Sequence, residues 1–325
     1  VSAMTVSNVI NGAGRASATT VATVQAAIAE LGYVPNLAAR RLAKARATTV
    51  GLIYSNRRTP FLDAVLVGSL RATNANGLQL ILRDGDGVTL DEAERIAQEL
   101  VRSGADALLL IPPFAEQLSG SAILPALGVP FAAIATGTPL SGISTVRIDN
   151  QAAMEALTRR VIADGHRRIA YVAGPDHYSV VAARLDGFYA ALQDAGLRVD
   201  DSLIVEHSAF DHASGMAAAQ ALLARPDRPT AILCSSDDLA AGVIAQAGQM
   251  GLTLPHDLSV TGFDDTILAS RVWPPLTVIR QPVEDMAFRA TQCLIGALGK
   301  GGMRVSDEIF DHQLVQRASI APAST

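Results

Sequence analysis

Three apolar runs in the first half of the chain decide its fold: Val50-Gly-Leu-Ile-Tyr54, Leu78-Gln-Leu-Ile-Leu-Arg83 and Ala107-Leu-Leu-Leu-Ile111. Each run has the length and composition of a buried strand, and helical patterns at 62–76 and 91–103 separate them. Apolar strands that alternate with helices are typical of a parallel sheet covered by helices on both faces.

The same alternation continues toward the C-terminus. The first series adds strands at 131–135 and 145–148 and a helix at 151–164. A second series predicts strands at 169–172, 203–205, 231–234, 259–262 and 277–279, and helices at 180–195, 212–224, 238–250 and 283–298. Ten strands in two series of five predict an α/β fold with two doubly wound lobes, in which ligands bind outside the carboxyl ends of the strands.

The composition excludes several classes of protein. Of 325 residues, 49% are hydrophobic and 18% charged, so the chain is not intrinsically disordered. The two cysteines, Cys234 and Cys293, form no CxxC pair, so we expect no disulfide framework, no metal site and no cofactor. Without a secretory signal or a long apolar run, we expect a cytoplasmic protein that does not bind a membrane.

Charge is unevenly distributed along the chain. Residues 1–49 contain five basic residues and one acidic residue, whereas the rest contains 21 basic and 30 acidic residues. A basic head on an acidic body favours a polyanionic partner for the head alone, although a segment this short can hold five basic residues by chance.

The head reads as three short helices. Ser2 and Ser17 are suitable N-caps for the first two, and Asn36 can cap a third, basic segment that follows Pro35. The third segment has few apolar residues to bury, so we expect a marginal helix unless a partner docks on it.

The first of these helices has the chemistry of a major-groove reader. Small and polar side chains permit close approach, contact phosphates and reach base edges. The residues concerned are Ala3, Met4, Thr5, Ser7 and Asn8. A surface helix that faces water is the alternative reading.

Residues 1–12, Ser17–Asn36 and Leu37-Ala-Ala-Arg-Arg-Leu42 closely resemble the LacI/GalR family of bacterial transcription regulators. The resemblance covers the head, the hinge and the rest of the chain. It implies a helix-turn-helix head at 1–35, a hinge helix at 36–47 and a two-lobed effector-binding and dimerisation domain at 48–325. The implied lobes are about 48–149 with 281–308 and about 150–280 with 309–325.

The same resemblance implies a homodimer that binds double-stranded operator DNA, and we expect a repressor. A small metabolite bound between the lobes, a sugar or sugar derivative, would change its affinity for the operator. In the head, the resemblance makes the first helix the recognition helix and adds Ser17, Asn36, Ala39 and Leu42 to the DNA-binding residues. Leu42 matches the leucine that wedges into the minor groove, where unstacking costs a few kcal/mol; an ordinary packing role is the alternative.

Two departures from the family pattern stand out. The family's first head helix is absent from this sequence, so we expect the chain as written to bind DNA weakly. Asn8 stands where members often carry Arg, and Asn favours adenine where Arg favours guanine.

Two charged residues match the family's effector-binding positions. Arg184 lies in Ala-Ala-Arg-Leu-Asp-Gly, and its fixed fork suits hydroxyls or a carboxylate. Asp264 lies in Thr-Gly-Phe-Asp-Asp and can accept paired hydroxyl hydrogen bonds. The alternatives are a surface salt bridge for Arg184 and a helix N-cap for Asp264, a role that fits Asp265 better.

Four further residues complete the predicted effector site by resemblance: Phe61, Phe210, Ser236 and Gln281. The two aromatic residues would stack on the ligand, or belong to the core. Ser236 replaces an Asn of sugar-binding members, and the neighbouring Asp237 is expected to cap the next helix. Gln281 lies at a crossover between the lobes.

Two other classes of function remain. An exported solute-binding protein could use the same two lobes, but the basic hinge and the absence of a signal peptide argue against it. An α/β enzyme is the other, yet the sequence contains no nucleophile elbow, Walker loop, GxGxxG or HExxH motif, so we expect no enzymatic activity.

Overall fold

The computed structural model describes residues 1–2, 5–6, 9, 17–30, 48–55, 59–85, 89–298 and 304–323. The chain forms two compact units, Val1–Ala47 and Thr48–Thr325.

The described part of the smaller unit contains helix α2, Ala18–Glu30. Ser17 Oγ accepts a hydrogen bond from the Thr20 amide at 3.3 Å, which confirms the predicted N-cap. Ser2 Oγ likewise accepts from the Thr5 amide at 3.2 Å. Seven predicted DNA contacts lie outside the described residues: Ala3, Met4, Ser7, Asn8, Asn36, Ala39 and Leu42.

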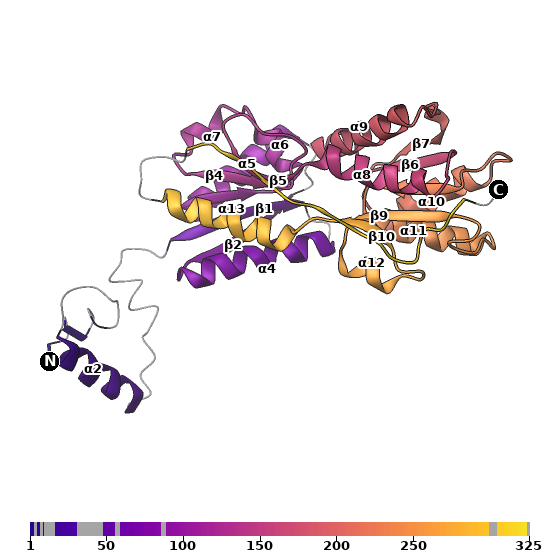
Figure 1. Cartoon of the computed structure of the whole chain (residues 1–325). Helices are drawn as coiled ribbons and strands as arrows, with labels where there is room; N and C mark the ends of the chain where they lie inside the picture. The colour runs from indigo at the N-terminus through magenta and orange to yellow at the C-terminus, as the bar shows by residue number, and fades with distance from the viewer. Residues whose placement is uncertain are drawn as a thin grey trace. The chain divides into compact units, whose positions relative to one another are not determined.

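The larger unit begins with a parallel six-stranded sheet of order β11-β5-β4-β3-β1-β2 (Figure 1). Its strands are β1 Thr49–Ser55, β2 Gln79–Gly85, β3 Ala107–Leu110, β4 Phe131–Ile134, β5 Ser144–Ile148 and β11 Asp307–Phe310. Helices α4 (Pro60–Ala75) and α13 (Val283–Ala297) pack on one face. Helices α5 (Leu90–Arg102), α6 (Phe114–Leu118) and α7 (Ile123–Ala126) pack on the other.

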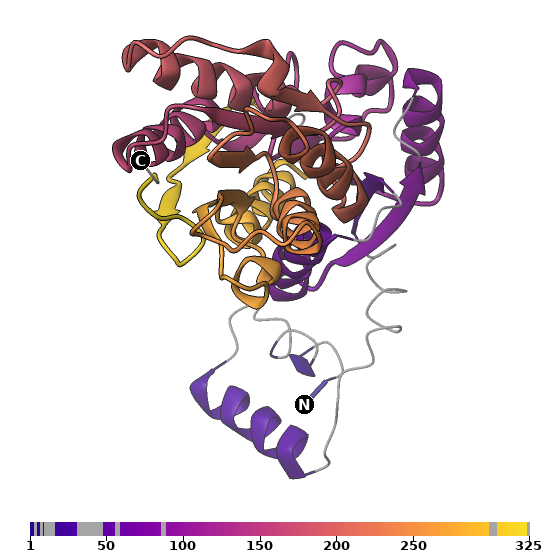
Figure 2. The same cartoon turned by 90° about the vertical axis from the view of Figure 1, so that its right-hand side faces the viewer.

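A second six-stranded sheet has the order β12-β10-β9-β8-β6-β7, and helices lie on both of its faces (Figure 2). Its strands are β6 Ile169–Ala173, β7 Ile204–Glu206, β8 Ala231–Cys234, β9 Ser259–Asp264, β10 Thr277–Arg280 and β12 Gln313–Val315, of which β12 alone is antiparallel. The helices are α8 Asn150–Ala163, α9 Ser179–Asp194, α10 His212–Leu223, α11 Asp237–Gln249 and α12 Ile267–Arg271, with a 3₁₀ turn at Asp201–Leu203.

The α/β fold with two doubly wound lobes is therefore confirmed, but the strand count was wrong. The described residues form two strands that the sequence did not predict, β11 and β12. Both are short edge strands, Asp-Glu-Ile-Phe and Gln-Leu-Val, and neither contains a long apolar run. β11 pairs with β5 of the first sheet and ends at Phe310.

Burial on both faces explains the apolar runs of the central strands, whereas β2, formed by the run at 78–83, is a partly exposed edge strand. In β6, Ile169, Tyr171 and Ala173 pack toward α8 and α9, while Ala170 and Val172 pack toward α10 and α11. Side chains of a strand alternate between the faces of its sheet, so a sheet covered on both sides requires apolar residues at every position.

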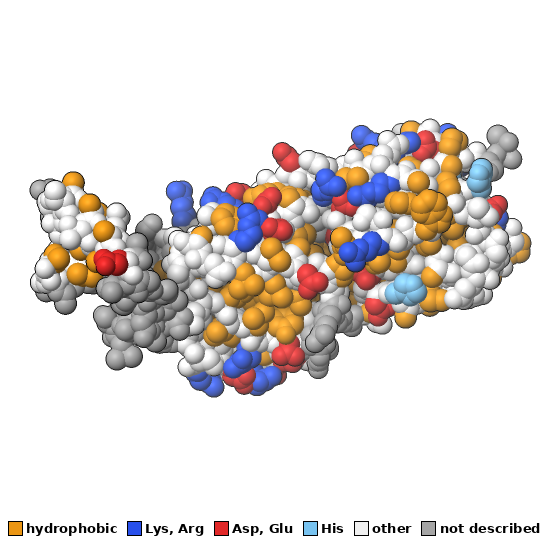
Figure 3. All heavy atoms as spheres, turned by 90° about the horizontal axis from the view of Figure 1, so that it is seen from below, with side chains coloured by type: hydrophobic (Ala, Val, Ile, Leu, Met, Phe, Trp, Pro, Cys, Tyr) orange, Lys and Arg blue, Asp and Glu red, His pale blue; other side chains and the backbone are white. Residues whose placement is uncertain are grey.

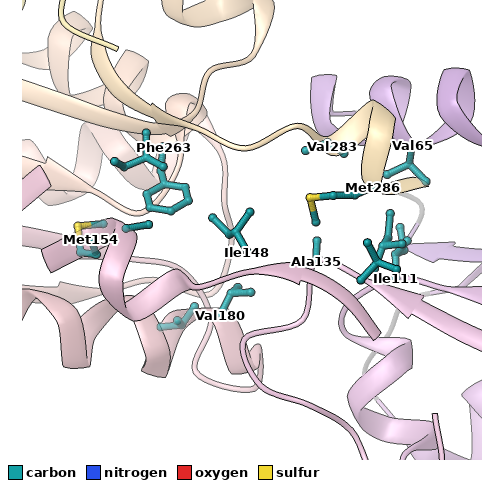
Figure 4. Packing of buried hydrophobic residues seen from close by; sticks show 14 of the residues in the cluster. Val65, Ile111, Ala135, Ile148, Met154, Val180, Phe263, Val283 and Met286 are labelled. Carbon is teal, nitrogen blue, oxygen red and sulfur yellow. The ribbon is translucent and has the colours of Figure 1, made fainter. Parts of the chain in front are cut away.

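One hydrophobic cluster runs through both lobes (Figure 4). Val65 and Met286 lie in its first-lobe part, and Met154 and Phe263 lie in its second-lobe part. The chain crosses between the sheets three times, from β5 to α8, from β10 to α13 and from β11 to β12. The two lobes therefore share a core and three connections.

Close packing of α13 on α4 depends on Gly68. A Cβ atom at this position would lie 2.1 Å from the backbone oxygen of Glu284 in α13. Arg71, one turn further along α4, pairs with Glu284 and lies 5.2 Å from the centre of the Phe288 ring. This contact fixes α13, the helix that follows β10 of the second sheet, onto the first lobe.

Candidate functional site

A cavity of about 120 Å³ lies between residues of the two lobes. All six residues predicted from the sequence line it: Phe61, Arg184, Phe210, Ser236, Asp264 and Gln281. The structure thus brings together side chains that are separated by up to 220 positions in the sequence.

The cavity lies at the carboxyl ends of the strands. Ser55 is the last residue of β1, Ala135 follows β4 and Asp264 is the last residue of β9. Ile111 and Ser236 lie just beyond β3 and β8. This is where open parallel sheets bind their ligands, because the loops there diverge and leave a crevice.

Arg184 is held from several sides. Its Nε donates to Asn150 Oδ1 at 2.9 Å, its Nη1 donates to the Ser235 carbonyl at 2.5 Å, and its Nη2 lies 3.5 Å from Asp264 Oδ1. The guanidinium carbon lies 3.7 Å from the centre of the Phe263 ring, a cation–π contact. Burial lowers the pKa of Arg184, and the charge of Asp264 opposes this shift. The side chain is 5% exposed, so it is not the surface salt bridge that we considered.

Asp264 faces Arg184 from the end of β9. Its Oδ1 also accepts a hydrogen bond from Gln281 Nε2 at 2.5 Å. Burial raises the pKa of the Asp264 carboxyl to about 6, although Arg184 and Gln281 oppose the shift. The backbone at Asp264 has φ = 102°, a strained conformation for a residue with a side chain. Such strain is typical of positions whose side chain must point in one direction.

Asp237 does not cap α11 as predicted. Ser236 is the N-cap, and its Oγ accepts from the Leu239 amide at 3.3 Å. Asp237 is the first residue of the helix, and its Oδ2 accepts from the amide and hydroxyl of Thr266 at 2.6 and 2.9 Å. Burial raises the pKa of Asp237 well above its ordinary range. The sequence could not reveal this role because Thr266 belongs to a distant loop.

Asp265 is not a helix cap either. Its Oδ2 accepts from Arg280 Nε at 2.6 Å, and its Oδ1 lies 2.7 Å from Arg317 Nη2. Thr266 occupies the N-cap position of α12. Asp265 therefore ties the β9 loop to β10 and to the C-terminal segment, directly beside the cavity.

The aromatic residues both line the cavity and pack against the shared core. Phe210 meets Tyr178 edge to face, with ring centres 5.2 Å apart and an angle of 86° between the rings. Phe61, in the first turn of α4, also contacts the core cluster. The two alternatives considered for Phe61 and Phe210, ligand stacking and core packing, are thus compatible.

A polar contact between α6 and α9 joins the lobes beside the cavity. Ser179, the first residue of α9, donates from its Oγ to Glu116 Oε1 of α6 at 2.6 Å and accepts from the Gly137 amide at 2.8 Å. Glu116 and Gly137 belong to the first lobe and Ser179 to the second. Burial raises the pKa of Glu116, and hydrogen bonds from Ser179 oppose this.

Comparison with known proteins identifies the family. A model of lacI-family bacterial regulatory proteins matches residues 1–36, and a periplasmic binding protein-like domain matches residues 158–320. The HTH-type transcriptional regulator CelR of Thermobifida fusca is 35% identical over 304 residues, which cover 90% of this chain and 86% of the relative. The chain belongs to the LacI family of bacterial regulatory proteins.

Other LacI-family members are similarly close. The ribose operon repressor of Escherichia coli (strain K12) is 34% identical over 298 residues, which cover 91% of this chain and 89% of the relative. A solved structure described as a complex of CelR with cellobiose has 32% identity and a TM-score of 0.74, over 98% of this chain and 96% of that one. These relatives are transcriptional regulators rather than enzymes.

The described residues of this LacI-family chain contain no candidate membrane span and no candidate metal-binding group. No helix there has both the length and the apolarity needed to cross a bilayer. Nor do His, Cys, Asp and Glu side chains gather there in a group that could hold a metal ion.

The sequence missed several cavity residues. Three of them are Thr59, Tyr178 and Asp238. Thr59 is the N-cap of α4, Tyr178 directly precedes α9, and Asp238 lies in the first turn of α11. Their common signal is position, since each lies next to the N-terminus of a helix that follows a strand. The rule that ligands bind at strand ends could have found them.

Proposed function

We propose that this LacI-family chain regulates transcription, as a repressor, by binding operator DNA through residues 1–47 and a small effector in the cavity of the larger unit. The effector is a sugar or sugar derivative. One observation carries the proposal: the six residues expected to bind an effector line a single cavity. The match of residues 1–36 to lacI-family regulators favours this role over that of a solute-binding protein.

The chemistry of the cavity suits a polyhydroxylated ligand. Arg184 and Gln281 donate hydrogen bonds, and the Asp264 carboxylate accepts them, so hydroxyl groups that do both find partners. Phe61 and Phe210 offer apolar surface of the kind that lines small-molecule sites. Relatives support the same ligand class, since one is described with cellobiose and another is named for a ribose operon.

For the head, we propose that Thr5 and Ser17 contact DNA. Ser17 lies at the N-terminus of α2, where the helix dipole favours a phosphate group. The remaining DNA contacts are proposed at residues outside the described part of the chain, from Ala3 in the recognition helix to Leu42 in the hinge. The excess of basic residues in this segment supports binding to a polyanion.

The functional unit that we propose is a homodimer. One small head makes too few contacts for specific recognition of an operator, and a dimer doubles them. Hydrophobic side chains gather on one face of the larger unit (Figure 3). Val67 and Leu70 of α4 are 46% and 44% exposed, and Trp273, close to α12, is 85% exposed. Exposed apolar groups of this kind are suited to pairing of subunits.

The effector acts, in this proposal, by favouring one arrangement of the lobes. A ligand shifts such an equilibrium only through different affinities for the two states, and a coupling of about 1–3 kcal/mol changes DNA affinity about 5–150-fold. We propose no catalytic role and place the protein in the cytoplasm, where its DNA is.

A thermal-shift screen of sugars, followed by DNA-binding titrations, tests this function. We expect at least one sugar to raise the melting temperature and to change the affinity for operator DNA. A sugar that stabilises the protein without altering DNA binding would argue for a solute-binding protein. Turnover of the sugar would argue for an enzyme.

A further inference from the structure

The described residues that line the cavity carry more negative than positive charge. Two carboxylates line it, Asp238 and Asp264, and Arg184 is the single basic side chain among its described lining residues. Arg184 already faces Asp264 and donates to Asn150 and Ser235. Its charge is therefore matched within the protein, and no second cation among the described lining residues balances the charge of Asp238.

Asp238 lines this space from the start of a helix. It lies in the first turn of the 13-residue helix α11, where the helix dipole stabilises a negative charge. Among the described residues it forms no salt bridge, and it is half-buried. Burial and the charge of Asp211 raise its pKa, and His212 opposes them.

The charge of one cavity carboxylate also acts on the other. Burial is the main cause of the raised pKa of Asp264, and the charge of Asp238 adds to it. A carboxylate accepts hydrogen bonds and donates none, whereas hydroxyl and ammonium groups donate them. An anionic ligand placed here would meet like charge, which costs binding energy.

We propose that Asp238 determines the ligand specificity of the cavity: it accepts a hydrogen bond from a hydroxyl or ammonium group and excludes anionic ligands. The ligand is then a neutral sugar or an amino sugar, not a sugar acid or a sugar phosphate. This inference rests on the proposed function, because it concerns the effector of the same cavity.

The test is a thermal-shift screen, followed by calorimetry of the hits, on the full chain and on Asp238→Asn. The panel holds matched sets of neutral, amino and acidic ligands: glucose, glucosamine and glucuronate; galactose, galactosamine and galacturonate; ribose and ribose 5-phosphate; and cellobiose. In the unaltered protein we expect hits among the neutral and amino members alone. In Asp238→Asn we expect these hits to bind about tenfold more weakly, the size of one charged hydrogen bond, and the matching acids to gain binding.

Two further variants separate charge from structure. Asp238→Glu keeps the charge, so it should continue to exclude acids even though its reach is altered. Asp91→Asn removes an exposed first-turn carboxylate of α5 that does not line the cavity, and its ligand profile should match that of the unaltered protein.

The outcomes are distinct. Equal binding of an acid and its neutral counterpart by the unaltered protein overturns the specificity role, and so does an identical profile for Asp238→Asn. If no member of the panel stabilises the unaltered protein or any variant, the proposed sugar-binding function fails, and this inference fails with it.

Discussion

At the scale of single residues, Arg184 organises the second-lobe side of the cavity. Removing it leaves the Asp264 carboxylate buried without its cation, a loss that typically costs about 3–5 kcal/mol. We expect Arg184→Ala to abolish the effector response and lower the melting temperature, while the folded variant still binds operator DNA. Calorimetry and DNA titrations measure both effects. Arg289→Ala is the matched control, because it breaks an exposed pair with Glu308; unchanged induction in Arg184→Ala would contradict the site.

The raised pKa of Asp264 predicts two opposite dependences on pH. The folded carboxyl titrates at about 6 and the unfolded one near 3.8, so the folded state binds its proton more tightly. This group's contribution to stability is present below about pH 4 and is lost as the pH rises to about 6. Effector affinity moves the other way: it falls as the pH drops through about 6, because the protonated carboxyl is a poorer acceptor.

Asp264→Asn is the measurement for this residue. Both pH dependences should flatten in this variant, as measured by thermal melts and by calorimetry between pH 4 and pH 8. A wild-type affinity that is constant over this range would show that Asp264 does not bind the effector through its ionised form.

At the scale of elements, α6 and α9 meet across the lobes through Glu116 and Ser179. We expect Glu116→Ala to favour separation of the lobes and so to weaken effector binding, with a larger radius of gyration in small-angle scattering. Glu94→Ala is the control, since Glu94 accepts a similar hydrogen bond from Ser121 within the first lobe. If the two variants behave alike, the contact between α6 and α9 does not control closure.

The same junction contains a position that accepts only glycine. A Cβ atom at Gly137 would lie 2.2 Å from the Ser179 backbone oxygen. We expect Gly137→Ala to push the lobes apart and to reduce effector affinity more than Glu116→Ala does, because a backbone clash cannot be relieved by a side-chain rotation. Gly248→Ala, in α11, meets no atom within 4 Å and should leave affinity unchanged.

Strands buried on both faces carry the strongest sequence signal, although the edge strands β2 and β7 were predicted as well. The run around Ile169–Val172 is apolar at every position because helices cover both sides of β6, and this pattern predicts a strand. The edge strands β11 and β12 lack that signal. The roles of Asp237 and Asp265 were also hidden, since Thr266, Arg280 and Arg317 reach them only after the chain has folded. Asp238 was missed because its importance depends on the charge of the assembled cavity.

At the scale of the whole molecule, we propose that the smaller unit binds DNA and the larger unit binds the effector. All described residues that line the cavity lie in Thr48–Thr325. We expect the fragment 48–325 to bind the effector as the full chain does and to lose operator binding. Calorimetry and DNA titrations of both proteins measure this. Loss of effector binding in a folded fragment would mean that the first 47 residues contribute to the cavity.

The three connections between the sheets bear on how such a gene can be recombined. Because the chain leaves the first sheet after β5, returns to it for α13 and β11, and departs again for β12, neither lobe is encoded by one continuous stretch. A crossover that exchanges one whole lobe between relatives would need three breakpoints, one at each connection. The unit Val1–Ala47 needs a single breakpoint. Shuffling can therefore join a whole sensor to a new DNA-binding head in one event, whereas the exchange of a single lobe between two sensors needs several breakpoints.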